Sequence, residues 1–95
     1  MTGHYRDIVI ETYRNSGSPS GRVIRARPVA GQGLAVELNV ECSTKMREAH
    51  PTGTLMIVRA KITDVEGTPF LYTHYNWPYK VITMAEAQRF IRNRQ

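Results

Sequence analysis

Aromatic and basic side chains gather in the second half of the chain, where they could stack on flat rings and pair with phosphates. Five of the eight aromatic residues fall between positions 70 and 79, with His74 among them. Bases of single-stranded nucleic acid stack on such rings while cations meet the phosphates. The predicted binding residues are Arg59, Lys61, Phe70, Tyr72 and His74, together with Arg25 and Arg27 from an earlier basic cluster.

The same aromatic residues could instead belong to the core, to a pocket or to a protein interface. Tyr75 and Trp77 fall on the apolar side of the alternation, where large rings commonly anchor small cores. As an alternative, these two side chains line a small-molecule pocket between sheet and helix or at a dimer interface. Aromatic residues and arginine are also enriched at protein interfaces, so Arg59 with Phe70 and Tyr72 favours a homodimer or another protein partner.

Catalytic and metal-binding patterns are weak in this sequence. His4, His50 and His74 are too widely separated for metal-ligand spacing. Cys42 falls on the apolar side of an alternating segment, where a lone cysteine is usually inert packing. The acidic residues form no helix-borne pair for general acid–base work. We expect no catalytic residues, cofactor or metal, although the pocket alternative leaves a minor catalytic role open.

Length and composition predict one globular domain over 1–95 with a positive charge. Hydrophobic residues make up 41% and charged residues 22% of the chain, which argues against disorder. The net charge of +5 favours acidic partners, with nucleic acid first. Arginines on exposed strands, such as Arg25 and Arg27, also discourage edge pairing, so their charge has an ordinary structural use as well.

Location follows from what the sequence contains and lacks. No apolar run approaches the roughly 20 residues of a membrane span, and the first residues form no apolar signal segment. Cys42 is the only cysteine, which fits a reducing compartment. We therefore expect a cytoplasmic protein without membrane contact.

Most of the chain is predicted to form strands, and these strands must position the candidate side chains. Segments 7–14, 22–27 and 34–42 are predicted strands, because they are rich in β-branched residues or alternate between apolar and polar positions. Residues 44–49 predict a short helix, which His50-Pro51 and Gly53 end.

A β-hairpin is predicted from residues 54–63 and 70–77, with its loop centred on Glu66-Gly67. Its register puts the apolar side chains on one face and the basic and aromatic ones on the other. Pro78 ends the pairing, and residues 79–82 can resume it. The predicted pairs are Ile62 with Leu71, Lys61 with Tyr72, Ala60 with Thr73, Arg59 with His74, Val58 with Tyr75 and Met56 with Trp77.

The C-terminal residues predict a helix that begins with a capping box over Thr83 to Glu86. Its apolar stripe is Met84, Ala87, Phe90 and Ile91, which suits packing on a sheet. The predicted fold is α+β: a single bent, mainly antiparallel sheet of five strands that can close into a barrel-like form. The order is β-β-β-(short α)-β-β-α, with the C-terminal helix packed on one face.

The function that these patterns favour is that of a small, basic, non-enzymatic binding protein. Its basic and aromatic sheet face would associate with a second copy of the chain, with another protein, or with nucleic acid. The alternative is a small-molecule-binding or minor catalytic protein that uses the pocket at Tyr75 and Trp77.

Overall fold

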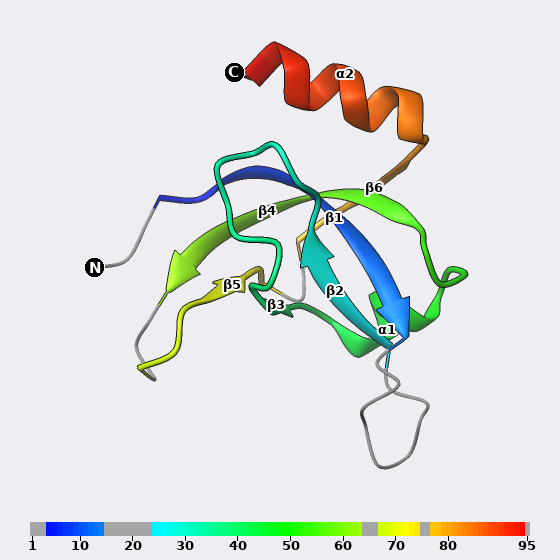
Figure 1. The fold of residues 1–95 in the computed structure, drawn as a ribbon. Helices are drawn as coiled ribbons and strands as arrows, with labels where there is room; N and C mark the ends of the chain where they lie inside the picture. The colour runs from blue at the N-terminus through cyan, green and yellow to red at the C-terminus, as the bar shows by residue number, and fades with distance from the viewer. Residues whose placement is uncertain (1–3, 15–23, 64–66, 75–76, 95) are drawn as a thin grey trace.

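The arrangement of sheet and helices comes from a computed structural model, which describes residues 4–14, 24–63, 67–74 and 77–94. The elements are β1 (Arg6–Arg14), β2 (Ile24–Pro28), β3 (Val40–Glu41), α1 (Thr44–Glu48), β4 (Leu55–Thr63), β5 (Phe70–Tyr72), β6 (Lys80–Ile82) and α2 (Met84–Arg94) (Figure 1). This order, with a short helix in mid-chain and a longer one at the C-terminal end, confirms the predicted α+β class.

The sheet is mixed and strongly bent. Five strands are hydrogen-bonded in the order β2-β1-β4-β5-β3, and β6 pairs with β4 off this path. All pairs are antiparallel except β3 with β5. The two ends of the path, β2 and β3, approach each other without pairing, so the sheet curls but does not close (Figure 1). The sheet has six strands rather than the expected five, because residues 80–82 form a separate strand.

The inside of the curled sheet holds one hydrophobic core. Met56, Val58 and Ala60 of β4 are at most 2% exposed. They pack with Ile8, Ile10, Ala26, Val40, Met46 and Leu71. Because side chains alternate between the faces of a strand, Ile57, Arg59 and Lys61 lie on the outer face. The two-faced strand predicted from the alternation is confirmed.

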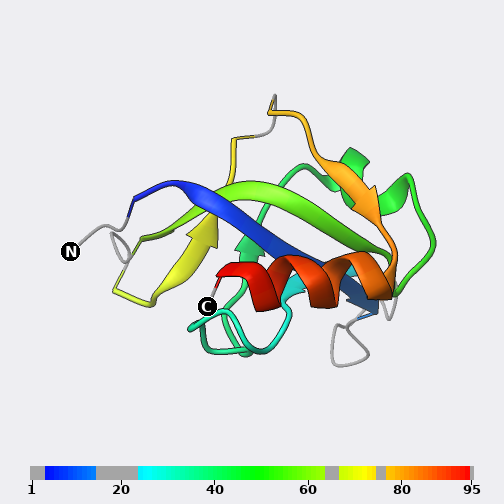
Figure 2. The same ribbon diagram turned by 90° about the horizontal axis from the view of Figure 1, so that it is seen from above.

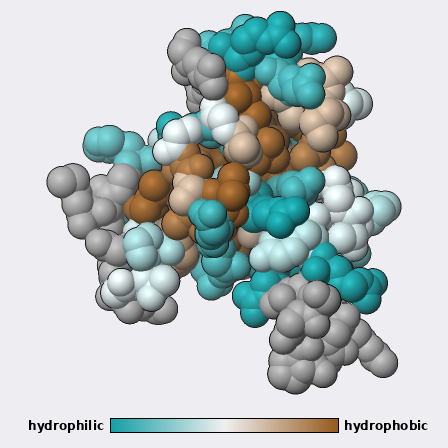
Figure 3. All heavy atoms as spheres, in the orientation of Figure 1, coloured by the Kyte–Doolittle hydropathy of each residue, from teal (hydrophilic) through white to brown (hydrophobic). Residues whose placement is uncertain are grey.

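A second apolar cluster joins α2 to the outer face of the sheet. It consists of Val9, Leu55, Ile82 and Ala87, with Val29, Ile57, Phe90 and Ile91 packed against it. Figure 2 shows α2 lying over the sheet beside β1, and Figure 3 shows hydrophobic side chains between the helix and the sheet. Met84, predicted as part of the packing stripe, is instead 54% exposed, because it is the first residue of α2 and lies at the edge of the contact.

Both helices begin with side-chain caps. The Glu86 N–H donates to the Thr83 hydroxyl at 3.1 Å, and the Thr83 N–H donates to the Glu86 carboxylate at 2.9 Å, which confirms the capping box. The hydrogen bond from the Thr83 N–H, helped by the Thr83 side chain, lowers the pKa of Glu86. In α1 the Ser43 hydroxyl accepts the Met46 N–H at 3.2 Å.

The predicted strand at 34–42 is wrong for most of its length. Only Val40–Glu41 forms β3. The N–H of Leu38 donates to the carbonyl of Ala35 at 3.2 Å, so a turn interrupts the expected extended segment. The alternation had a different cause, namely burial: Leu34, Leu38 and Cys42 pack against the inner core from this irregular segment.

The hairpin pairs as predicted only near its turn. Lys61 pairs with Tyr72 and Ile62 with Leu71. Farther along the register is wrong, because β5 ends at Tyr72 and Met56 pairs with Val81 of β6. The predicted pairing of Val58 with Tyr75 falls on a residue outside the described ones.

Hydrogen bonds to other strands and turns separate the two arms of the hairpin. The N–H of Thr73 donates to the carbonyl of Glu41 at 3.1 Å, which holds the chain against β3. The N–H of Trp77 then donates to the carbonyl of His74 at 3.1 Å, which forms a turn. Pro78 has no N–H to offer a neighbouring strand. The chain therefore returns to β4 only at Lys80.

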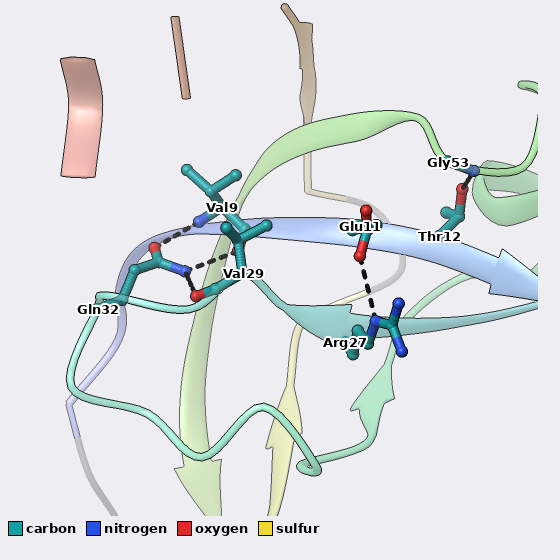
Figure 4. A network of polar contacts seen from close by, with 7 residues as sticks. All are labelled: Val9, Glu11, Thr12, Arg27, Val29, Gln32 and Gly53. Atoms are coloured by element: carbon teal, nitrogen blue, oxygen red, sulfur yellow. Dashed lines mark hydrogen bonds and ion pairs between the residues drawn. The ribbon is translucent and has the colours of Figure 1, made fainter. Parts of the chain in front are cut away.

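A glutamine side chain completes the edge of β1 where β2 ends. Pairing of β1 with β2 stops at Ile10 and Pro28. Beyond it, Gln32 Oε1 accepts the Val9 N–H at 2.8 Å (Figure 4). Gln32 Nε2 donates at 2.8 Å to the carbonyls of both Val9 and Val29. The Gln32 amide thus acts as one more rung of the ladder.

Candidate binding surface beside strand β4

A groove opens on β4 where its pairing is interrupted. On the same side of β4, β5 pairs with residues 61–63 and β6 pairs with residues 55–57. Residues 58–60 pair with neither strand. The groove beside them has a volume of about 490 Å³ and is lined by Asp7, Ile57, Val58, Arg59, Trp77, Pro78 and Lys80. We call it the β4 groove.

Aromatic rings continue the surface from the groove toward the end of β4. The Trp77 ring packs edge-to-face on the Tyr5 ring, with centroids 4.7 Å apart. The His74 ring lies 5.6 Å from Trp77. The Lys61 Nζ sits 4.8 Å from the centre of the Tyr5 ring, which is a cation–π contact. A cation and three rings are therefore brought together by segments far apart in sequence.

Tyr5 is the member of this group that the sequence did not reveal. It stands next to Arg6, which pairs with Ala60, and this register carries Tyr5 alongside Lys61. The pairing of β1 with β4 links residues about fifty positions apart and leaves no local signature. An alternating pattern shows which face a residue takes, but not which distant strand lies next to it.

Charge around the groove is mainly positive. The Arg59 side chain is 59% exposed, and its Nη1 lies 3.9 Å from an oxygen of Asp7, which is 47% exposed. An ion pair this open is weak because water competes for both partners. Lys80 is also exposed and lines the groove. Arg59 and Lys80 can therefore turn toward an acidic ligand at little cost.

The other predicted residues of this face lie nearby on β5. Tyr72 is half-buried and stands opposite Lys61, so the two share the outer face. Phe70 is half-buried and pairs with Thr63, farther from the groove. The structure thus brings Lys61 and Tyr72 together on one face, links His74 to it through Trp77, and leaves Phe70 at the far end.

Arg25 and Arg27 do not belong to this surface. They lie on β2, which is separated from β4 by β1. Arg27 Nε donates to Glu11 Oε1 at 3.1 Å (Figure 4), and its guanidinium lies 4.6 Å from the centre of the Tyr13 ring. Arg25 is half-buried. The charge of Arg27 therefore serves contacts within the β1–β2 pair, whereas the Nε of Arg25 is buried without a hydrogen-bond partner among the described residues.

The predicted pocket residues are divided between different places. Trp77 lines the β4 groove, and Tyr75 lies outside the described residues. A separate hollow of about 270 Å³ lies beside α2 and is lined by Arg6, Asp7, Gly31, Gln32, Gly33, Phe90 and Ile91. A cavity between sheet and helix therefore exists, and Trp77 is not among the described residues that line it.

Groups that could do chemistry are dispersed. Burial raises the pKa of the Cys42 thiol, against a smaller lowering by Arg47, so the thiol stays protonated near neutral pH. The His50 Nε2 lies 3.0 Å from the Tyr79 hydroxyl. Within the described ranges no three metal-ligating side chains come together. In the same part of the chain, neither helix is long and apolar enough to cross a membrane.

Comparison with known proteins adds no relative. No protein-family model, curated protein or solved structure matches this chain.

Proposed function

We propose that this chain is a non-enzymatic binding protein whose outer β4 surface binds single-stranded nucleic acid. The observation that carries the proposal is the grouping of Lys61 and Trp77 around the Tyr5 ring, next to the groove at Arg59. Rings that can stack on bases, alternating with cations that can meet phosphates, are the recurring components of single-strand binding surfaces. The net charge of +5 adds a long-range attraction for the same ligand.

A single strand suits this surface better than a duplex. Rings can stack only on bases whose faces are uncovered, and a duplex covers them. Arg59 and Lys61 are two residues apart on one face of a strand. Their side chains are therefore spaced along a single line, which suits the phosphates of one strand rather than the two backbones on either side of a duplex groove. As the only cysteine, Cys42 is consistent with a reducing, cytoplasmic setting for this activity.

The test is a titration with a single-stranded oligonucleotide, followed by the fluorescence of Trp77, the only tryptophan. Affinity should fall with salt, with a slope of about −0.7 per phosphate contact. The double replacement Arg59→Gln with Lys61→Gln should flatten that slope by about 1.4. The control is Arg89→Gln with Arg92→Gln, which makes the same charge change on exposed positions of α2.

Two outcomes would refute the proposal. One is the absence of binding at low salt. The other is an equal loss of binding in the α2 control, because this would mean that only net charge matters. Light scattering on the same samples tests the homodimer that the sequence suggests: a salt-stable dimer that ignores the oligonucleotide would assign the surface to self-association.

A further inference from the structure

Resting on the proposed function, we propose that the β4 groove holds one unpaired base, whose edge bonds to the main chain of Arg59 while its face meets Trp77. The groove therefore reads the base itself rather than the phosphate backbone. Three properties of the groove lead to this inference: the direction of the Arg59 main chain, the width of the interruption in pairing, and the nature of the walls.

The direction of the Arg59 main chain follows from the alternation of hydrogen bonds along neighbouring strands. The N–H groups of Leu71 and Thr73 donate to carbonyls of residues 39 and 41, so they face β3. Tyr72, between them, must turn its N–H and carbonyl toward β4. Its partner Lys61 therefore faces β5, and two positions back Arg59 points to the same side.

At Arg59 that side of β4 is occupied by the groove. β5 stops short of it at residue 61, and β6 begins beyond it at residue 57. The N–H and carbonyl of Arg59 thus present one donor and one acceptor side by side. Edges of nucleobases carry neighbouring donors and acceptors of the same kind, so one strand residue can form two hydrogen bonds with one base.

The interruption is too short for an added peptide strand. Peptides that extend a sheet form a row of main-chain hydrogen bonds along several residues. Among the described residues, only 58–60 of β4 lack a main-chain partner on this side, and of these three only Arg59 turns its N–H and carbonyl toward the groove. A single two-bond contact suits a compact planar group such as a base.

The walls suit a flat ring with phosphates on either side. Ile57, Trp77 and Pro78 give the groove an apolar lining, and Val58, whose side chain is buried in the inner core, borders it between Ile57 and Arg59. Lys80 and Arg59 are exposed and line the same groove, so their side chains can meet the phosphates of the flanking nucleotides. The ligand class is thus a base within a single-stranded oligonucleotide.

The experiment compares an ordinary single-stranded oligonucleotide with an abasic one of equal length and charge, using ¹⁵N-labelled protein. The ordinary strand should shift the Arg59 amide resonance and change Trp77 fluorescence. The abasic strand should bind at least about tenfold more weakly and should leave the Arg59 amide resonance unshifted. Equal affinity for both strands would overturn the inference while leaving the proposed function intact. Failure of both strands to bind would remove the proposed function too.

A pair of variants tests the stacking wall independently. Trp77→Ala should weaken binding of a labelled oligonucleotide by roughly 5- to 150-fold, whereas Trp77→Phe should retain most of the affinity. Thermal unfolding verifies that each variant is folded. If Trp77→Ala fails to fold, the abasic comparison on the unchanged protein still decides. Equal binding by both folded variants would overturn the inference.

Discussion

Replacing Gln32 by leucine should destabilise the protein far more than its place in a loop would indicate. The side chain makes three hydrogen bonds of 2.8 Å to the main chains of Val9 and Val29. Leucine has a similar size but no polar atoms. The Val9 carbonyl would keep the Val29 N–H as a donor at 3.1 Å. The Val9 N–H would lose its partner at a residue that is 0% exposed.

The magnitude can be worked from these contacts. A typical intramolecular hydrogen bond contributes about 1 kcal/mol net, and a buried N–H left without a partner costs about 1–3 kcal/mol. We expect Gln32→Leu to lower the free energy of unfolding by about 3 kcal/mol. For a domain of this size, that corresponds to a fall in Tm of roughly 12–24 °C.

The assay is urea unfolding followed by circular dichroism, with Gln88→Leu as the matched control. Gln88 is exposed on α2, so the same chemical change there should shift the free energy by less than about 0.5 kcal/mol. Equal effects of the two replacements would refute the reasoning, because they would show that the Gln32 amide is not needed as a rung of the sheet.

Three further predictions concern single groups. Thr12→Val removes a buried hydroxyl that accepts the Gly53 N–H at 3.2 Å, and should cost about 1 kcal/mol in urea unfolding; no loss would contradict this role. The pKa of Glu86 is lowered in the folded state, so its contribution is present above its unfolded pKa and lost as pH falls through the folded one. The stability difference between the unchanged protein and Glu86→Ala should therefore narrow on acidification, and a widening would disagree. Burial raises the pKa of Cys42, so iodoacetamide should modify it at least about tenfold faster in urea than in the folded state at pH 8; equal rates would show that the thiol is accessible.

Local patterns predicted the parts of this fold that local physics determines. The two faces of β4 follow from the alternation alone, because residues two positions apart in a strand lie on the same face. The start of α2 follows from Thr83 and Glu86, which satisfy each other's main chains within one turn. The pairing of Lys61 with Tyr72 follows from the nearby loop.

The features that escaped prediction depend on distant partners. The hairpin separates because Thr73 bonds to Glu41, a residue about thirty positions away. Tyr5 joins the binding surface only through the pairing of β1 with β4. The alternation at 34–42 indicated burial correctly except at Val36, which is 41% exposed, and the irregular chain around the turn at Leu38 provides most of that burial without a strand. Of the candidate surface, the sequence therefore indicated Arg59, Lys61, Tyr72 and His74, with Trp77 as a pocket residue, but neither Tyr5 nor the groove beside β4.

The division of the apolar side chains into two clusters has a consequence for how the molecule opens. The inner cluster lies within the curled sheet, whereas the outer one depends on Ala87, Phe90 and Ile91 of α2. Detaching α2 would uncover the outer cluster and leave the inner one closed. Amide protons of α2 should therefore exchange with solvent through a local opening whose free energy is lower than that needed to expose the amides of the β1–β4 pair. The helix and the curled sheet would then behave as two cooperative units within one chain.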